Sequence, residues 1–297
     1  MNTTKQFLLA GFFTSILVFI LPSISRAKEI VVPEQHKTIQ AAIEAASAGD
    51  VILVEPGTYN EHLVLKHGIT LKSVGDDTQG KLGLLRAEKT IINGGGKQGG
   101  APGVDLAEEA VLDGFTITNI GVYDDVKWNK HHATQGNLQS HEHIGAPGVA
   151  GIAITGISKC TVTNNIVHHV GYTGIAITGN PSKQVSPRII RNFSYRNMGG
   201  GIGSMKKSTA FISENTCFEN FYAGIGHDNA SPLVTKNICY SNIRAGIGIS
   251  ESACPIVRGN RCYKNRRAGI GTRTGSMTKP VIEDNDCYQN DMAGIGN

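Results

Sequence analysis

Hydrophobic and polar residues repeat along the last hundred residues with a period of 22 to 25. Each repeat begins with an Asn, has an aromatic residue three positions later and a second Asn five positions later, and ends in a Gly-rich segment. The first Asn residues are Asn192, Asn215, Asn237, Asn260 and Asn285. A fixed period of this size predicts a solenoid in which each coil packs only against its neighbours.

Alternation within each repeat assigns residues to two faces. The column after the first Asn contains Arg261 and Asp286, and we expect it to face water because charges in a narrow core are costly. The next column is expected to point inward, since successive strand residues face opposite sides. It consists of Ser194, Cys217, Cys239, Cys262 and Cys287. A second inward column contains Ile225, Ile247, Ile270 and Ile295, and the Asn side chains are expected to stack as hydrogen-bonded ladders.

The rest of the chain supplies a cap and an interruption. Thr38 to Ala48 predicts a short amphipathic helix, capped by Thr38 and ended by Gly49, that closes the first coil. Residues 121–148 break the period and predict a long loop. The expected organisation is a signal peptide over 1–27 and one domain over 28–297, with its cap at 28–50 and regular repeats at 151–297.

Composition and charge narrow the possibilities. The chain has 297 residues, 37 of them Gly, and 6% aromatic residues, which suits tight turns and narrow stacked interiors. A net charge of +4 is too small to indicate a nucleic-acid-binding surface. Lys5, the apolar stretch 7–21 and Ser25-Arg26-Ala27 are typical of a secretory signal, with a membrane anchor as the alternative. We expect a periplasmic or extracellular protein with no stable membrane span after signal removal.

These features together resemble the right-handed parallel β-helix, the pectin-lyase-like fold. The opening, Thr38-Ile-Gln-Ala-Ala-Ile-Glu44 followed by Ala48 to Tyr59, is similar to carbohydrate-binding and sugar-hydrolase β-helix domains. It also resembles the NosD-type periplasmic copper-accessory proteins of nitrous oxide reductase. The resemblance implies an all-β fold but leaves activity open, because this fold carries lyases, hydrolases, epimerases, adhesins and accessory proteins.

One aromatic residue per coil is expected to face outward, at roughly 4.8 Å intervals. These residues are Tyr195, Phe218, Tyr240, Tyr263 and Tyr288. Such a column is a candidate platform for sugar rings. The alternative is that the rings pack over the bend and shield the Asn ladder. Nearby Lys264, Arg244, Arg267 and Arg273 are candidate partners of an acidic polysaccharide or simply solvated side chains.

Histidines gather in and after the interrupted segment and are candidate ligands of copper or zinc. They are His131, His132, His141, His143, His168 and His169. Their spacing matches no established motif, and the alternative is a solvated loop.

The four stacked Cys, spaced 22, 23 and 25 apart, do not have zinc-ligand spacing. A disulfide within the column is possible in an oxidising compartment, but parallel in-register side chains are badly aimed for a bond. We expect buried, unpaired thiols.

His227 and Asp228, with Lys206, are the candidates for acid–base catalysis. His227 occupies the column of Ser204, Ile249 and Thr272, so it is expected to point inward or lie at a strand end, and the alternative role is a His bonded to a neighbouring Ser or carbonyl. The Arg-x-Pro-x-x-Arg signature of pectate lyases and the Asp-Pro-His-Glu motif of mannuronan epimerases are absent.

The sequence therefore predicts an exported, non-catalytic protein that binds metal or polysaccharide. The alternative is a polysaccharide lyase, hydrolase or epimerase acting on an acidic glycan. The sequence stops in mid-repeat at Asn297 without a polar cap, so we expect either end-to-end stacking on a partner such as a second copy of the chain, or a truncated form of a longer array.

Overall fold

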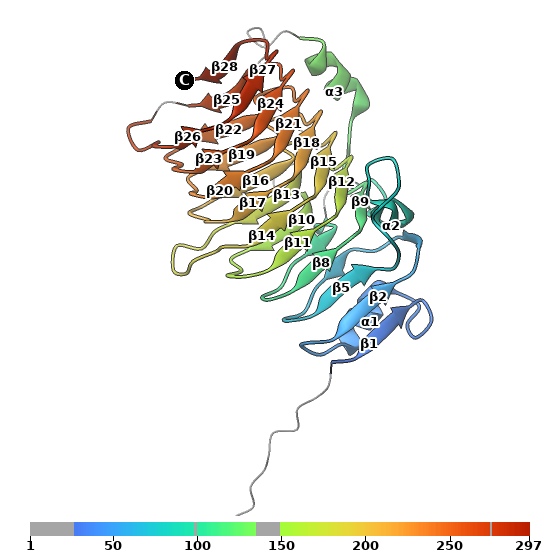
Figure 1. Ribbon diagram of the computed structural model, residues 1–297. Coiled ribbons are helices and arrows are strands. Elements are labelled where there is room, and N and C mark those ends of the chain that lie inside the picture. The colour runs from blue at the N-terminus through green and yellow to red at the C-terminus, as the bar shows by residue number, and fades with distance from the viewer. Residues whose placement is uncertain (1–26, 98–99, 135–148, 274) are drawn as a thin grey trace, which may run out of the picture.

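The computed structural model describes residues 27–97, 100–134, 149–273 and 275–297. These residues form a solenoid with three parallel sheets (Figure 1). Successive coils add one short strand to each of the three sheets. The all-β, parallel β-helix class predicted from the repeat is confirmed.

Within the described residues, sheet A has ten strands: β1 (Glu29–Val32), β2 (Val51–Val54), β5 (Thr70–Ser73), β8 (Val111–Asp113), β11 (Thr161–Thr163), β14 (Arg188–Ile190), β17 (Phe211–Ser213), β20 (Leu233–Thr235), β23 (Ile256–Arg258) and β26 (Val281–Glu283). Sheet B has nine: β3 (Gly57–Tyr59), β6 (Thr90–Asn93), β9 (Thr116–Thr118), β12 (Ile166–His168), β15 (Phe193–Tyr195), β18 (Thr216–Phe218), β21 (Ile238–Tyr240), β24 (Arg261–Tyr263) and β27 (Asp286–Tyr288). Sheet C also has nine: β4 (Leu63–Val64), β7 (Val104–Asp105), β10 (Ala150–Thr155), β13 (Thr173–Thr178), β16 (Ile202–Met205), β19 (Ile225–Asp228), β22 (Ile247–Ser250), β25 (Ala268–Thr272) and β28 (Ala293–Gly296).

Successive coils stack in register, so that like residues form columns. Cys217, Cys239, Cys262 and Cys287 are paired strand to strand in that order. The first three are buried, and all four are free thiols, as expected. Burial raises the pKa of the Cys239 thiol well above its usual range, so this column is unreactive apolar filling.

Two Asn ladders hold the bends on either side of sheet B. In the first, the side-chain amide of Asn215 donates to Asn237 Oδ1 at 3.0 Å and to the Ile189 and Ser213 carbonyls at 2.9 and 3.0 Å. The backbone N–H of Asn215 donates to the same Asn237 oxygen. Because the bend leaves these backbone groups without strand partners, the buried amides satisfy what would otherwise be orphaned polar groups.

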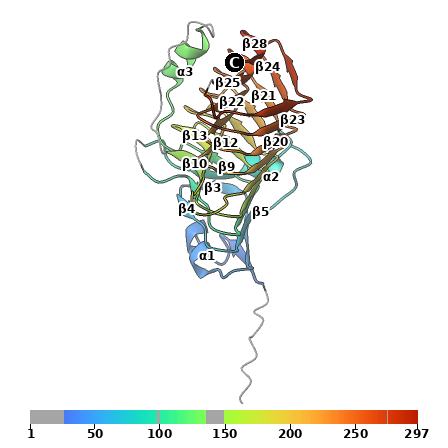
Figure 2. The same ribbon diagram turned by 90° about the vertical axis from the view of Figure 1, so that its left-hand side faces the viewer.

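The predicted cap is present as helix α1 (Ile39–Ala45), which buries Ile39, Ala42 and Ile43 against the first coil (Figure 2). Thr38 accepts a hydrogen bond from the Ala41 N–H, which confirms it as the N-cap. The helix ends at Ala45 rather than Ala48, because the chain becomes extended at Ala46 and the Asp50 carboxylate accepts a bond from the Ser47 N–H at 2.8 Å.

Two further helices were not predicted: α2 (Leu85–Lys89) and α3 (Asp125–His132). The expectation of a featureless loop over 121–148 is wrong for its first half, since α3 lies there beside the later coils (Figures 1 and 2). Asp124 caps α3, and Trp128 packs in a cluster with Met198, Phe221 and Ile243. Residues 135–148 lie outside the described residues.

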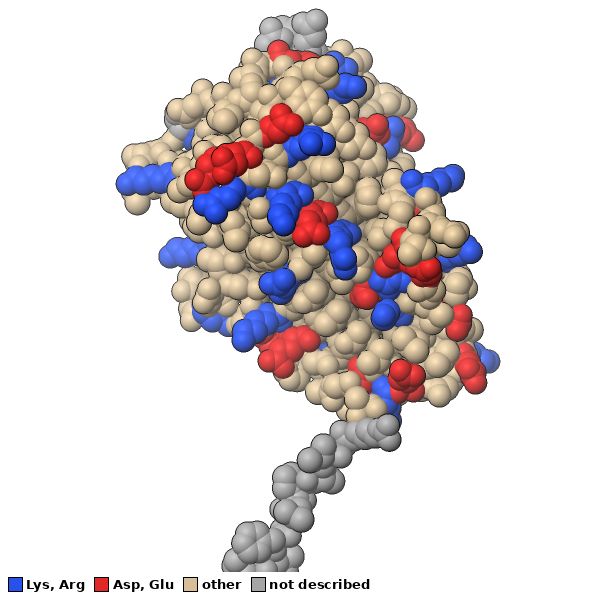
Figure 3. Space-filling model, in the orientation of Figure 1, with Lys and Arg blue, Asp and Glu red and all other residues tan. Residues whose placement is uncertain are grey.

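No helix in the described ranges is long and apolar enough to span a membrane. In the view of Figure 3, basic and acidic side chains are intermixed over the surface.

Candidate ligand-binding face

The aromatic column lies on the outer side of sheet B, and its rings stack on one another. Consecutive ring centroids from Tyr195 to Tyr288 are 4.6 to 5.1 Å apart, with interplanar angles of 2° to 9°. His168 extends the stack by one coil, 4.9 Å from Tyr195. The ring faces that a sugar would need therefore contact neighbouring rings, and the edges point outward. Sugar binding by this column stays a prediction.

The candidate metal ligands are dispersed among aromatic contacts. His131 packs edge-on against Phe221 and His132 stacks on Trp128. His168 and His169 meet through their Nδ1 atoms at 2.7 Å. Burial lowers the pKa of His168 to about 4, so this contact is between neutral rings. In the described part of the chain, no three His, Cys, Asp or Glu side chains are grouped to hold a metal. His141 and His143 lie outside it, and copper or zinc binding stays a prediction.

His227 points into the solenoid, as its column position predicted. It is 2% exposed, in register with Ser204 and Ile249, and neither ring nitrogen has a hydrogen-bond partner among the described residues. The alternative role, a bond to a neighbouring Ser or carbonyl, is not found among the described residues, and the Ser204 hydroxyl pairs instead with Ser208 at 2.6 Å. Burial lowers the pKa of His227 to about 3. A neutral His enclosed in the core has no access to a substrate on the surface.

Asp228, the next residue, is exposed at the carboxyl end of β19, a central strand of sheet C. Burial raises the pKa of its carboxyl, the Glu251 charge raises it further, and Arg273 opposes them. Lys206 follows the strand residue paired with Asp228 and is exposed, and its backbone N–H donates to the Asp228 carbonyl. Asp228 and Lys206 thus lie together at one flank of sheet C, while His227 does not join them.

Two glycine columns run along sheet C, and they differ in what a side chain would meet. The first includes Gly201, Gly224, Gly246 and Gly269, which point inward. A Cβ built on Gly224 would lie 2.8 Å from Asn242 Nδ2 and 2.9 Å from the Gly246 carbonyl oxygen. The fold therefore requires glycine in this column, since no real Cβ approaches so closely.

The second column consists of Gly203, Gly226, Gly248, Gly271 and Gly296 in continuous register, and we call it the glycine strip. It points outward. A Cβ on Gly226 would meet nothing within 4 Å, and on Gly248 only the Ala223 methyl at 3.3 Å. No residue of the strip has a positive φ. Ala176 and Ala153 continue it toward the N-terminus. Neither packing nor backbone geometry requires glycine at Gly226, whereas at Gly203 and Gly248 a Cβ would lie 3.3 Å from one neighbouring methyl group.

The strip leaves bare backbone over roughly 19 Å, at about 4.8 Å per coil. Glycine within a strand weakens a sheet, and it often marks a bulge, a tight bend or a place where a ligand or another backbone approaches closely. The Gly-Ile-Gly motif was visible in the sequence, but the sequence could not distinguish the required glycine from the dispensable one.

Arginines and tyrosines flank the strip. Arg244 lies 4.4 Å over the Tyr222 ring, and Tyr172 meets Tyr222 at 6.0 Å. Burial lowers the pKa of Arg244, and the charges of Arg267 and Arg273 lower it further. The charges of Arg267 and Arg273 thus act on Arg244 at the later coils of sheet C. Arg273 also pairs with Glu251 at 2.9 Å.

Residues 150–297 match the family described as a right handed beta helix region. Among solved structures, the fold is similar to pectate lyase Pel9A, at 13% identity over 91% of this chain and 79% of that chain, with a TM-score of 0.59. It is also similar to tailspike protein gp49 of Acinetobacter baumannii bacteriophage Fri1, a capsular polysaccharide depolymerase, at 10% identity over 91% of this chain and 55% of that chain (TM-score 0.50). An alginate lyase from Paenibacillus sp. str. FPU-7 matches at 14% identity over 91% and 99% of the chains (TM-score 0.49). No curated protein matches the sequence. At these identities the likeness shows the fold alone.

Proposed function

We propose, from the premise that the chain belongs to the right-handed β-helix proteins, that it is an exported, non-catalytic protein that binds an acidic polysaccharide along the outer face of sheet C. The observation that carries this proposal is the glycine strip, where a Cβ on Gly226 would meet nothing within 4 Å and where Arg244, Arg267 and Arg273 lie nearby. Export rests on the signal pattern over residues 1–27.

The chemistry follows from the two components of this face. Without side chains, the strip lets a pyranose ring lie within van der Waals contact of the backbone over several coils. Carboxylates of a uronic acid chain can then pair with Arg244, Arg267 and Arg273, which offer planar, multi-donor recognition. Tyr222, beside Arg244, adds an apolar surface for the sugar's C–H groups.

The test is the affinity of the purified protein for polygalacturonate, measured by calorimetry with neutral galactan as the comparison. Gly226→Val adds a side chain whose Cβ meets no protein atom within 4 Å, so we expect unchanged thermal stability and at least a tenfold loss of affinity. Arg244→Gln should weaken binding by a similar factor. Thr235→Val, which places the same side chain on the outer side of sheet A, is the matched control and should bind as wild type does. If Gly226→Val and wild type bind polygalacturonate with equal affinity, the glycine strip is not part of the binding site.

A polysaccharide lyase or epimerase is the second candidate, favoured by Asp228. This carboxyl lies at the flank of the strip, and its pKa is raised by burial, as suits a proton-transferring group. Release of ultraviolet-absorbing unsaturated uronate from pectate or alginate, lost in Asp228→Asn, would establish this activity in place of the non-catalytic role.

A further inference from the structure

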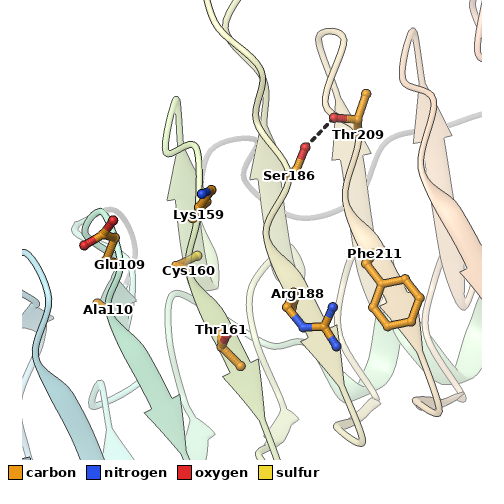
Figure 4. Close-up of a pocket in the computed structure, with 9 residues that line it drawn as sticks. All are labelled: Glu109, Ala110, Lys159, Cys160, Thr161, Ser186, Arg188, Thr209 and Phe211. Atoms are coloured by element: carbon orange, nitrogen blue, oxygen red, sulfur yellow. Dashed lines mark hydrogen bonds between the residues drawn. The ribbon is translucent and has the colours of Figure 1, made fainter.

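A second candidate site lies on sheet A, away from the glycine strip. Here a cavity of about 550 Å³ opens beside the starts of β11, β14 and β17 (Figure 4). Its size is within the ordinary range for small-molecule sites, about 300–1,000 Å³. Residues 179–187 connect β13 to β14 next to this cavity, and Lys183 in that connection pairs with Glu108 at 3.3 Å. We call this hollow the sheet A cavity.

Hydroxyl groups line one side of the cavity. Ser186 Oγ and Thr209 Oγ1 lie 2.7 Å apart on neighbouring coils, and Thr161 adds a third hydroxyl (Figure 4). Thr209 Oγ1 also lies 3.2 Å from the Val185 carbonyl oxygen, to which it donates. In this arrangement the Ser186 hydroxyl donates to Thr209 Oγ1, and Gln184 Nε2 also donates to that oxygen at 3.5 Å, so the acceptor positions left for a ligand are those of Ser186 Oγ. Oriented hydroxyls of this kind fit a ligand that itself carries several hydroxyls.

Two cations line the cavity as well. Arg188 extends over the Phe211 ring at 4.8 Å, and within the described ranges no carboxylate lies within ion-pair distance of it or of Lys159. Arg258, on the same outer face of sheet A, differs because Glu283 pairs with it. Glu109, also in the lining, lies 3.8 Å from His67. The cavity therefore holds an excess of positive charge beside an aromatic ring.

We propose that the sheet A cavity binds one acidic sugar residue, a hexuronate. Its carboxylate pairs with Arg188 and Lys159, its hydroxyls donate to Ser186 Oγ, and its C–H groups contact the edge of the Phe211 ring, whose face lies under Arg188. A simple carboxylate such as acetate would contact only the cations of the cavity. A neutral sugar would contact only its hydroxyl groups and the Phe211 ring. Recognition requires both halves, which lie within one cavity.

The test is binding of free galacturonate to the full protein, measured by ligand-observed NMR. Acetate serves as the probe of the cations alone, and galactose as the probe of the hydroxyl groups and the ring alone. We expect galacturonate to bind at least tenfold more tightly than either. Arg188→Gln and Thr209→Val should each weaken galacturonate binding about tenfold. Arg258→Gln, an arginine on the same face outside the cavity, should leave it unchanged.

Gly226→Val separates this site from the strip and should also leave galacturonate binding unchanged. Equal binding of acetate and galacturonate would overturn the proposal, as would unaltered affinity in both cavity variants. Loss of binding in Gly226→Val would place the monosaccharide on sheet C instead. If Arg188→Gln does not fold, Thr209→Val, which keeps the side-chain volume, decides the matter.

Discussion

His227 is an imidazole enclosed in the core with both nitrogens unpaired among the described residues. Ile249 occupies the same position one coil later, so the fold accepts an apolar side chain there. An unsatisfied buried polar group costs stability, and protonation of a ring that burial holds neutral costs more.

This burial predicts a pH dependence of stability. The folded-state pKa of His227 is about 3 and the ordinary pKa of a histidine is 6.5, so between these values the unfolded chain binds more protons. The free energy of unfolding should therefore fall as the pH falls from 6.5 toward 3. His227→Leu should remove roughly 2–3 kcal/mol of this loss between pH 7 and 4.5. Urea denaturation at both pH values measures it, with exposed His67→Gln as control. An identical pH dependence in wild type and His227→Leu would contradict the burial of a neutral ring.

The inward position of His227 could be predicted from the sequence, but its lack of partners could not. Periodicity assigns a residue to a face because each coil repeats the same alternation. Partners depend on which neighbouring hydroxyls are already engaged, and Ser208 engages Ser204 through a turn that no repeat pattern specifies.

At the scale of elements, the aromatic column of sheet B is a continuous stack. Tyr240 lies 4.9 Å from Phe218 and 5.1 Å from Tyr263, nearly parallel to both. Its contacts on both faces come from the protein itself, so its role in the structure is to join neighbouring coils.

Tyr240→Ala should therefore lower the free energy of unfolding by roughly 2–4 kcal/mol, from lost burial and two lost stacking contacts. The affinity of the folded variant for polygalacturonate should not change. Tyr288→Ala removes a ring with a single stacking neighbour among the described residues, so it should cost less. Thermal denaturation and calorimetry of both variants measure this. A large loss of glycan affinity with little loss of stability would assign the column to the ligand.

Helix α3 shows why one element escaped prediction. Its residues are mostly polar and interrupt the period, which by itself indicates a loop. The helix is held by Trp128, whose indole N–H donates to the Glu219 carbonyl at 2.9 Å and whose ring packs under Arg196. Those partners lie about seventy to ninety residues later, and such long-range contacts override local propensity.

At the scale of the whole molecule, the repeat determines which residues share a column, and the strand registers follow from it. The candidate site was harder to predict from the sequence, because the Gly-Ile-Gly motif contains two glycines with opposite orientations. The two glycines are distinguished only by the space around them in the structure. A Cβ on Gly224 would clash with its neighbours, and a Cβ on Gly226 would meet nothing within 4 Å. The sequence analysis named the arginines near the strip. It did not predict that the backbone beside them lacks side chains on its outer face.

The most direct test of this account is a crystal structure of the protein with a bound oligogalacturonate. The account predicts sugar rings along the outer face of sheet C, over Gly203, Gly226 and Gly248, with a carboxylate bonded to Arg244, Arg267 or Arg273. An oligosaccharide along the Tyr195–Tyr288 edge, with sheet C unoccupied, would contradict it.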